Sequence, residues 1–477
     1  MDVVVSDAPA YEKQSSRYNQ EQLSAASGTP VLPSKGNQKL LVIPVKISDY
    51  AVNATAANLA RLKTTFFGKS EETSWESLAS YYNKSSYGAL NITGKVTDWF
   101  DCGYSTTQIK ALTGSGENAS YYDPTWTILE KAVAWYKQNN TDIADYDNNK
   151  DGILDGVWLV YSAPYYSETN GLGDTFWAYT YWDYDALATN PTAANPVAGN
   201  YCWASYNFMN EGYGANGVDA HTYIHETGHL MGLDDYYVAS SKDGTKNYGP
   251  MGGIDMMDYN IIDHNAYSKF AFGWENPYVV SGACEITLNP ASKTGDSILL
   301  PTSDGWNGSA FDEYLLLEYY TPTDLNEKDS ASAYPGNGVQ GFSENGIRIY
   351  HVDARMAKMN SSSNFVSYTN DIVSDDSYFT VAAHSNSNAY NVTNIDFRLI
   401  QELDCTKKRN FDTGSENGSS IVADNSSLFQ NGDSFTFGAY SASFPKKTTM
   451  NDATAFPYAI HFGEQTNAGA KITITLA

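Results

Sequence analysis

Cysteine is scarce in this chain of 477 residues, and long apolar runs are absent. The four cysteines, Cys102, Cys202, Cys284 and Cys405, lie far apart and form no Cys-x-x-Cys pair. This spacing excludes a cysteine-based zinc cluster and a dense disulfide scaffold, but it is compatible with one or two long-range disulfides and equally with unpaired buried thiols. No apolar run reaches the ~18 residues that a membrane-spanning helix needs, so no membrane span is expected.

Basic residues are also scarce, with 29 Lys and Arg against 55 Asp and Glu and a formal net charge of -26. Nucleic acids and anionic membranes select basic surfaces, so neither is expected as a partner. The opening residues, MDVVVSDAPAYEKQSS, lack the basic start and the apolar stretch of a signal peptide. We expect that the natural N-terminus has been trimmed and that the protein is secreted or held at the cell surface as a monomer.

One stretch, HETGHLMGLDD at residues 225–235, has the pattern of a metal-binding helix. Residues four apart lie on one face of a helix, so His225 and His229 can direct their imidazoles at one metal ion. Glu226 lies beside them, where it can polarise a water molecule without binding the metal. An amphipathic helix with two hydrogen-bonded histidines is the alternative for the bare pentapeptide, and the residues that follow it make that alternative less favourable.

The third ligand is predicted to be Asp235. Gly232 can adopt the left-handed conformation that ends a helix and returns the chain towards the metal. Gly232 and Asp235 stand where the metzincin pattern has its turn glycine and third ligand, with Asp in place of the commoner His. A Glu on a later helix is excluded because the first Glu after Leu230 is Glu275. Asp234 is the competing candidate, one residue short of the expected spacing.

A methionine-rich segment follows at residues 251–260, MGGIDMMDYN. Metzincins place a methionine turn beneath the metal, and Met257 is the candidate here. Met257 followed by Tyr259 resembles the turn of the astacin and serralysin families, in which a tyrosine at this offset reaches the metal or the developing oxyanion. Core packing is the alternative for the methionines, and a buried aromatic ring with a satisfied hydroxyl is an equal alternative for Tyr259.

An acidic loop at residues 147–155 is predicted to bind calcium. Its Asp147, Asn149, Asp151 and Asp155 group hard oxygen ligands around a glycine turn. Calcium is favoured over an ion-free turn because crowded acidic groups repel one another unless a cation neutralises them. The loop is not an EF-hand, because Trp158 occupies the position of the bidentate Glu.

These motifs together resemble the immune inhibitor A-like family of secreted bacterial zinc metallopeptidases. The resemblance covers residues 38–360 in patches, and further segments that carry it are SYYNKSSYG, ITGKV, DHNAYSKFAFGW, EYLLLEYY and GIRIYHVDAR. It implies an extracellular endopeptidase with a catalytic zinc on His225, His229 and Asp235, and with structural calcium. It also implies that Val157–Tyr161 is the edge strand of the catalytic domain.

The chain is predicted to have an α+β fold with two domains. Residues 1–37 are polar and without sustained periodicity, which indicates a leader or linker. Residues 38–277 are assigned to a metzincin-like catalytic domain, in which the apolar run Lys39–Ile47 predicts a buried strand. In residues 278–477, short β-rich runs alternate with Gly, Asn and Ser clusters, which is typical of an antiparallel β-sandwich.

Two helices and two further histidines complete the expectations for the first domain. Asp123-Pro124 predicts the start of a helix, and Val218–Met231 is predicted as the helix that carries the metal motif. His221 lies one turn before His225, and a structural histidine is its main expectation. Asp263 is predicted to cap a helix starting at His264, whose ring faces a substrate pocket or solvent.

The sequence therefore predicts a secreted zinc endopeptidase that acts on protein or peptide substrates. Zinc would acidify its water molecule, Glu226 would take the proton, and Tyr259 would help to stabilise the oxyanion. The competing hypothesis is a non-catalytic extracellular adhesin or glycan-binding protein that keeps the metal only to support its fold. Glu226 counts against that hypothesis, because a structural metal site has no use for a general base.

Overall fold

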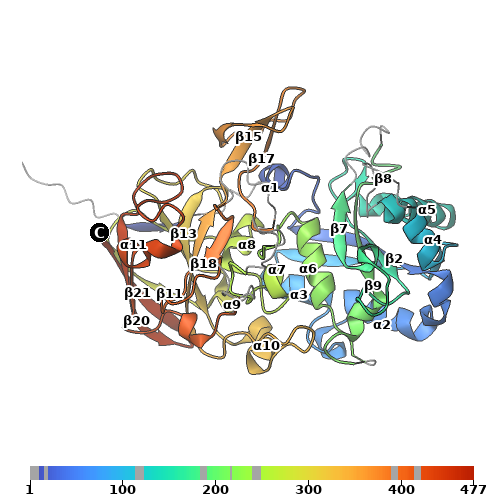
Figure 1. Ribbon diagram of the computed structural model, residues 1–477, viewed down its shortest axis with the longest axis horizontal. Coiled ribbons are helices and arrows are strands. Elements are labelled where there is room, and N and C mark those ends of the chain that lie inside the picture. Colours follow the sequence, from blue (N-terminus) through green and yellow to red (C-terminus); the bar gives the residue numbers. More distant parts are fainter. Residues whose placement is uncertain are drawn as a thin grey trace, which may run out of the picture. The chain divides into compact units, whose positions relative to one another are not determined.

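The computed structural model describes residues 10–14, 20–112, 123–182, 191–214, 217–238, 249–387, 396–412 and 421–477. These residues form a mixed α+β fold with several sheets, as the sequence predicted (Figure 1). The chain divides into two compact units. We call Thr29–Leu233 with Tyr334–Gly338 the α/β unit. The described parts of Met1–Gly28, Asp234–Ala333 and Val339–Ala477 are the β-rich unit.

These units differ from the predicted domains in where they begin and end. The division falls after Leu233, whereas the sequence placed a domain boundary after Pro277. The predicted leader is also partly structured: β1 (Tyr11–Lys13) pairs with β10 (Tyr278–Val280), and α1 (Gln20–Ser27) packs on β17 (Tyr378–Ala382) within the β-rich unit. Such pairing partners lie far away in sequence, so the local polarity of residues 1–37 did not reveal them.

The α/β unit is built on one large sheet with the strand order β3-β2-β6-β9-β7, and β5 (Ile153–Leu154) and β8 (Val197–Ala198) form a separate parallel pair. Its strands are β2 (Gly36–Lys46), β3 (Leu90–Val96), β6 (Val157–Tyr161), β7 (Tyr179–Trp182) and β9 (Asn200–Ser205), with the short β4 (Phe100–Asp101) pairing beside β2. All pairs are parallel except β7–β9, which is antiparallel. The predicted strand at Lys39–Ile47 is confirmed as the apolar part of β2, which is buried as expected for a central parallel strand.

The prediction that Val157–Tyr161 forms the edge strand is wrong. This strand is β6, which lies between β2 and β9 and is buried along its whole length. Among the described residues, the sheet ends at β3 on one side and at β7 on the other. Continuous burial on both faces explains the unbroken apolar run Val-Trp-Leu-Val-Tyr, which an edge strand would not need.

Helices cover both faces of this sheet. The helix predicted from Asp123 is α5 (Asp123–Asn139), and with α4 (Thr106–Ala111) it buries one face. On the other face lie α2 (Ala56–Phe67), α3 (Leu78–Ser85) and α6 (His221–Leu230). The rings of Phe66, Trp158 and Tyr223 meet on that face, with centroids 5.1 to 5.4 Å apart. Figure 1 shows α6 beside β7 and β9, with α4 and α5 beyond the strands.

The β-rich unit contains two larger sheets that share one apolar core. The first has the order β1-β10-β12-β13-β14-β18, with β12 (Ser297–Pro301), β13 (Glu313–Tyr320), β14 (Gly346–Asp353) and β18 (Ile400–Glu402). The second has the order β11-β21-β20-β19, formed by Cys284–Leu288, Gly469–Leu476, Tyr458–Thr466 and Ser434–Thr436. The predicted β-rich texture is thus present, but β10 and β12 pair in parallel, unlike the purely antiparallel arrangement that was expected.

Smaller elements of the β-rich unit carry the remaining motifs. The methionine-rich segment contains α7 (Met256–Tyr259), and α8 (Ala266–Ala271) follows it. The cap of α8 is Asn265, whose side chain accepts a hydrogen bond from the Ser268 amide, so the prediction of Asp263 as the cap is wrong. A three-stranded sheet of β16 (Phe365–Thr369), β15 (Met356–Asn360) and β17 (Tyr378–Ala382) completes the unit.

No helix among the described residues has both the length and the apolar character that a membrane span requires.

Candidate metal centre

His225, His229 and Asp235 form a compact group of metal-binding side chains. Each offers one ligand atom, and these atoms lie within 4.8 Å of one another. The two Nε2 atoms of the histidines are 3.1 Å apart. Within the described ranges, no other set of three or more His, Cys, Asp or Glu side chains meets this criterion. Two imidazoles and one carboxylate are a donor set that suits zinc and leaves coordination positions open.

The turn after α6 has the geometry that the sequence predicted. The helix ends at Leu230, and Gly232 follows with φ of 103°, a conformation that favours glycine. Nδ1 of His229 lies 2.8 Å from the carbonyl oxygen of Leu233 in this turn. A proton on Nδ1 donates to that carbonyl and leaves Nε2 as the lone-pair donor for a metal.

The adjacent Asp234 is bound by a loop of the β-rich unit. Its carboxylate accepts hydrogen bonds from the Ser385 hydroxyl, from the Asn386 amide at 3.1 Å and from the Ser387 hydroxyl at 2.7 Å. We call these three residues the polar clamp. Because the clamp occupies both oxygens of Asp234, the geometry favours Asp235 over Asp234 as the third ligand.

The backbone after Asp235 is fixed at two further points. The Tyr236 amide donates to the Met257 carbonyl at 2.7 Å, and the Tyr236 carbonyl accepts from the Asn386 side chain at 3.0 Å. The fully buried Asn386 side chain also donates to the Ile400 carbonyl at 2.8 Å. Asn386 of the polar clamp and the Met257 carbonyl therefore both fix the backbone of Tyr236, the residue that follows Asp235.

Met257 is completely buried in α7, whose cap is Asp255. The Asp255 carboxylate accepts from the Met257 amide at 2.8 Å. Tyr259 is half-buried, and its ring lies so close to Gly253 that a Cβ there would stand 2.9 Å from the ring. Gly253 has φ of 74°, so this close approach depends on glycine. The roles predicted for Met257 and Tyr259 at a metal stay predictions.

The candidate general base Glu226 is buried, and a threonine on the edge strand contacts it. Thr180 on β7 places its hydroxyl 3.0 Å from the Glu226 Oε2 and 2.9 Å from the Glu226 carbonyl oxygen. The Sγ of Cys202 on the neighbouring strand β9 lies 3.6 Å from the same Glu226 carbonyl oxygen. No local sequence pattern marks Thr180, because it lies 46 positions before Glu226 in a segment of Tyr, Trp and Ala without periodicity.

Helix α6, which carries His225 and His229, is fixed to the sheet and to α3 by polar contacts. The Trp158 ring nitrogen donates to the Thr227 hydroxyl at 3.3 Å, and that hydroxyl donates to the Tyr223 carbonyl at 2.8 Å. Tyr82 of α3 donates to the Ile224 carbonyl at 2.6 Å. Both contacts come from buried aromatic residues, so α6 has a defined rotation about its axis, which determines where His225 and His229 point.

The metal helix begins later than predicted. It starts at His221, because both backbone groups of Val218 bond to Ser74, at 3.0 and 3.1 Å. His221 is fully buried between the rings of Trp75 and Tyr334, with centroids 4.2 and 4.1 Å away. Its Nδ1 lies 2.7 Å from the Asp219 carboxylate. These contacts agree with the structural role expected for His221.

His264 was expected to face a substrate pocket or solvent. It is buried, with only 2% of its surface exposed, and lies near the rings of Phe272 and Trp274. The prediction of a ring exposed to solvent is therefore wrong. The apolar aromatic side chains that enclose it come from the residues after α8.

The predicted calcium loop is closed by its own hydrogen bonds. Asp147 accepts from the amides of Asp151 and Gly152 at 3.1 and 3.0 Å, and Asp155 accepts from the Asn149 amide at 3.3 Å. The other oxygen of Asp155 is buried and has no hydrogen-bond partner among the described residues. Burial raises the pKa of the Asp155 carboxyl to about 7, and the neighbouring carboxylates Asp151 and Asp147 add to the rise.

This unsatisfied oxygen fits a cation in the loop, because a cation would stabilise the charged form of Asp155. The loop carboxylates do not converge as tightly as the His225 group. Calcium, which also accepts amide and carbonyl oxygens, stays a prediction for this loop.

Comparison with known proteins adds no assignment: no protein-family model matches the chain, and no curated protein matches it.

Proposed function

We propose that the protein is a zinc-dependent endopeptidase of the metzincin type, similar to the immune inhibitor A-like peptidases. The observation that carries the proposal is the group of His225, His229 and Asp235, whose ligand atoms lie within 4.8 Å. The second support is Glu226, which is buried next to His225 and contacted by Thr180. General-base hydrolysis needs a carboxylate that lies beside the metal-binding side chains and is oriented by a hydrogen bond.

A zinc ion bound by these residues would lower the pKa of a water molecule and polarise the scissile carbonyl. Glu226 accepts the proton as the water attacks, and then delivers it to the leaving amine. The Thr180 hydroxyl holds the Glu226 side chain in one orientation during both proton transfers. The Leu233 carbonyl holds the His229 ring by its Nδ1, so Nε2 is the atom that would bind the zinc ion.

We assign the binding of substrate main chain to β7 in place of the edge strand that was expected at Val157–Tyr161. In the part of the chain that the structure describes, β7 is the last strand of the sheet and runs antiparallel to β9, and Thr180 on this strand contacts Glu226. An extended peptide added to the outer edge of β7 would be held by main-chain hydrogen bonds. The same strand would then bind the substrate and orient the general base.

The proposals for calcium and for the location of the protein rest on the amino-acid sequence. We assign structural calcium to the loop at residues 147–155 and place the mature protein outside the cell. The acidic balance, 55 Asp and Glu against 29 Lys and Arg, suits an extracellular protein with cation sites.

The proposal is tested with casein or gelatin as the substrate and with the zinc content of each sample measured. The wild-type protein is expected to cleave, and Glu226→Gln is expected to bind zinc and lose about 100-fold or more of the rate. If neither protein cleaves while zinc is bound in equal amount to protein, the peptidase proposal fails. The adhesin hypothesis, in which the metal only supports the fold, would then take its place.

A further inference from the structure

The sheet of β15, β16 and β17 exposes an unusual amount of apolar surface. We call residues 356–382 the arm, and Figure 1 shows it extending beyond the two larger sheets of the β-rich unit. Five of the nine exposed large apolar side chains among the described residues belong to it: Phe365 at 37%, Val366 at 48%, Tyr368 at 37%, Ile372 at 38% and Tyr378 at 37%. Such a concentration marks an interaction site more often than an ordinary surface.

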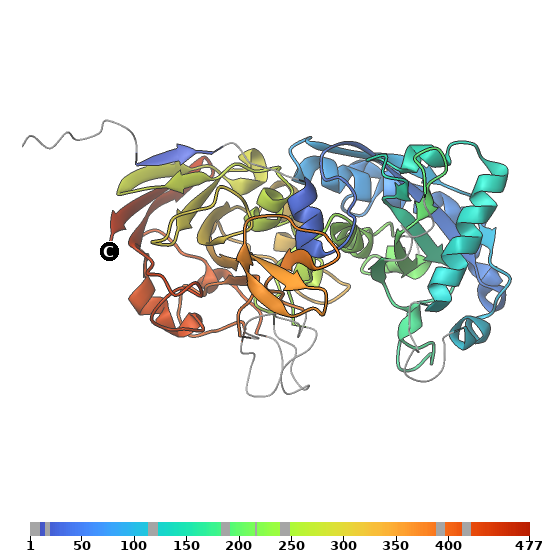
Figure 2. The same ribbon diagram turned by 90° about the horizontal axis from the view of Figure 1, so that it is seen from above.

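One side of the arm is already covered. β15 lies in the middle of the sheet, and β17 contacts α1, as Figure 2 shows for the dark blue helix beside the orange strands. The chain before β17 returns along it, with the Thr380 amide donating to the Val373 carbonyl at 2.9 Å. The Val381 side chain lies beside Gly28 at the end of α1. The side of β17 is therefore closed.

The opposite side of the arm is open. β16 pairs with β15 from Phe365 to Thr369, and within the described part of the chain no strand pairs with its other edge. Its sequence, Phe-Val-Ser-Tyr-Thr, contains neither a charged residue nor a proline, two of the devices that protect an edge strand. A register shift in the pairing with β15 leaves Val366 between the paired residues Phe365 and Ser367. β16 therefore offers unpaired main-chain groups between exposed aromatic and aliphatic side chains.

The aromatic side chains of this edge are held in place. The rings of Phe365 and Tyr368 pack edge to face, with centroids 5.3 Å apart. The Arg355 guanidinium lies 4.2 Å from the Tyr368 ring centroid, and Arg355 also binds Asp353 through two hydrogen bonds at 2.7 and 2.8 Å. Aromatic rings fixed before binding lose little entropy when a partner arrives, as is typical of binding anchors.

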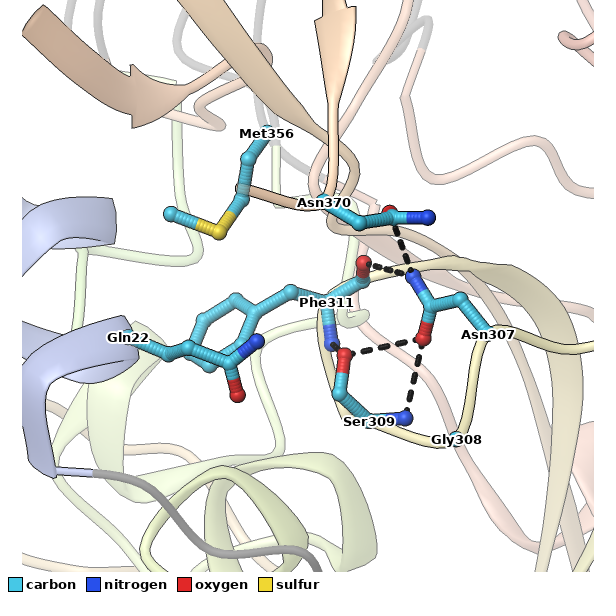
Figure 3. Close-up of a pocket in the computed structure, with 7 residues that line it drawn as sticks. All are labelled: Gln22, Asn307, Gly308, Ser309, Phe311, Met356 and Asn370. Atoms are coloured by element: carbon cyan, nitrogen blue, oxygen red, sulfur yellow. Dashed lines mark hydrogen bonds between the residues drawn. The ribbon is translucent and has the colours of Figure 1, made fainter. Parts of the chain in front are cut away.

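A small cavity lies where the arm joins the rest of the β-rich unit, and the hydrogen bonds of Asn307 in its lining help to hold the end of β16. It has a volume of about 130 Å³ and lies between α1, the loop at residues 307–311 and the arm residues Met356 and Asn370 (Figure 3). Asn307 donates to the Asn370 side chain at 3.0 Å and to the Phe311 carbonyl at 2.9 Å. Asn307 also accepts from Ser309, so its polar atoms are engaged in fixing the end of β16.

Charge indicates which partner fits the open edge. The arm contains one basic residue, Lys358, against three exposed acidic residues, Asp371, Asp375 and Asp376, which gives 1 − 3 = −2. The ammonium group of Lys358 lies 4.0 Å from the Tyr378 ring centroid. A second copy of this chain would bring an identical acidic arm and a net charge of -26, and an anionic membrane would also be repelled. A basic partner is therefore favoured.

We propose that the outer edge of β16 binds an extended polypeptide segment with apolar and basic side chains, and that this segment belongs to a protein substrate. The segment adds to the sheet as a further strand, held by its main chain and by contacts with the exposed rings. The assignment of the segment to a substrate rests on the proposed peptidase function. The binding itself needs neither zinc nor cleavage.

The test measures binding in the Glu226→Gln protein, so that loss of cleavage does not affect it. The probe is a fluorescein-labelled extended peptide that alternates Val or Phe with Lys, and its fluorescence anisotropy gives the Kd. Val366→Lys is expected to weaken binding at least ~tenfold, because lysine on an edge strand blocks pairing and repels the basic probe. Val52→Lys is the matched control, since Val52 is 80% exposed in the α/β unit and is expected to leave the Kd unchanged.

Two further measurements keep the test decisive if Val366→Lys alters the arm itself. Asp376→Lys changes an exposed charge, and it is expected to weaken binding of the basic probe while strengthening binding of a matched Glu-containing probe. The basic probe with alternate amides N-methylated is expected to lose binding, because main-chain pairing is removed. Equal binding of basic and acidic probes, or binding that survives both Asp376→Lys and N-methylation, would overturn the proposal.

Two outcomes with the active protein separate the possible occupants. If the segment belongs to a substrate, Val366→Lys raises KM for a basic unfolded protein and leaves kcat/KM for a short peptide unchanged. If light scattering instead finds a wild-type dimer that Val366→Lys dissociates, a second copy of the chain occupies the edge and the proposal is wrong.

Discussion

Replacing Thr180 with valine removes the hydroxyl that contacts Glu226 and preserves the shape of the side chain. A hydrogen bond to a charged group contributes about 1.5 to 3 kcal/mol. The single hydroxyl proton is shared between Oε2 at 3.0 Å and the carbonyl oxygen at 2.9 Å, so we expect the lower end of this range at the carboxylate. About 1.4 kcal/mol corresponds to a tenfold loss in kcat/KM. Valine suits a β-strand, and the free energy of unfolding is expected to fall by less than about 1 kcal/mol.

The assay is hydrolysis of a quenched fluorescent peptide by zinc-loaded wild-type, Thr180→Val and Thr180→Ser proteins of equal zinc content. Serine keeps the hydroxyl, so Thr180→Ser is expected to remain within about threefold of the wild-type rate. A Thr180→Val protein within twofold of the wild type would refute the role of this hydroxyl. So would a Thr180→Ser protein as slow as Thr180→Val, because keeping the hydroxyl would then not preserve the rate.

Three other perturbations have defined outcomes. Asp234→Ala leaves the polar clamp without its acceptor and frees the backbone before Asp235, so zinc affinity measured against a competing chelator is expected to fall about tenfold; unchanged affinity would show that the clamp has no part in metal binding. Calcium removal is expected to lower the melting temperature of the wild type and of Asp235→Ala alike, but not that of Asp155→Asn; no shift in the wild type would exclude calcium from the loop. Gly253→Ala places a Cβ 2.9 Å from the Tyr259 ring at a positive φ, so denaturant unfolding is expected to show a loss of about 1 to 3 kcal/mol; an unchanged midpoint would contradict that contact.

Sequence patterns predicted those features that depend on neighbours along the chain. The apolar run at Lys39–Ile47 predicted β2, because a strand buried on both faces needs apolar side chains at every position. The spacing of His225 and His229 and the turn at Gly232 also follow from local helix geometry. The start of α6 was misplaced because Val218 bonds to Ser74, which lies 144 positions earlier.

Long-range pairing accounts for what the sequence did not reveal. Whether Val157–Tyr161 is central or at an edge depends on strand order, which no local pattern encodes. The contact of Thr180 with Glu226 and the polar clamp on Asp234 join residues that are 46 and more than 150 positions apart. The clamp is the observation that separates Asp234 from Asp235, two adjacent aspartates that spacing alone left in competition.

The most direct test of the account is a zinc titration of the metal-free protein with peptide hydrolysis as the readout. The wild type is expected to gain activity linearly and to reach a plateau at about one zinc ion per chain, as a single catalytic site requires. Glu226→Gln is expected to bind the same amount of zinc and to remain at least about 100-fold slower. Full binding of zinc by the wild type without any hydrolysis, or equal rates for the wild type and Glu226→Gln, would contradict the account.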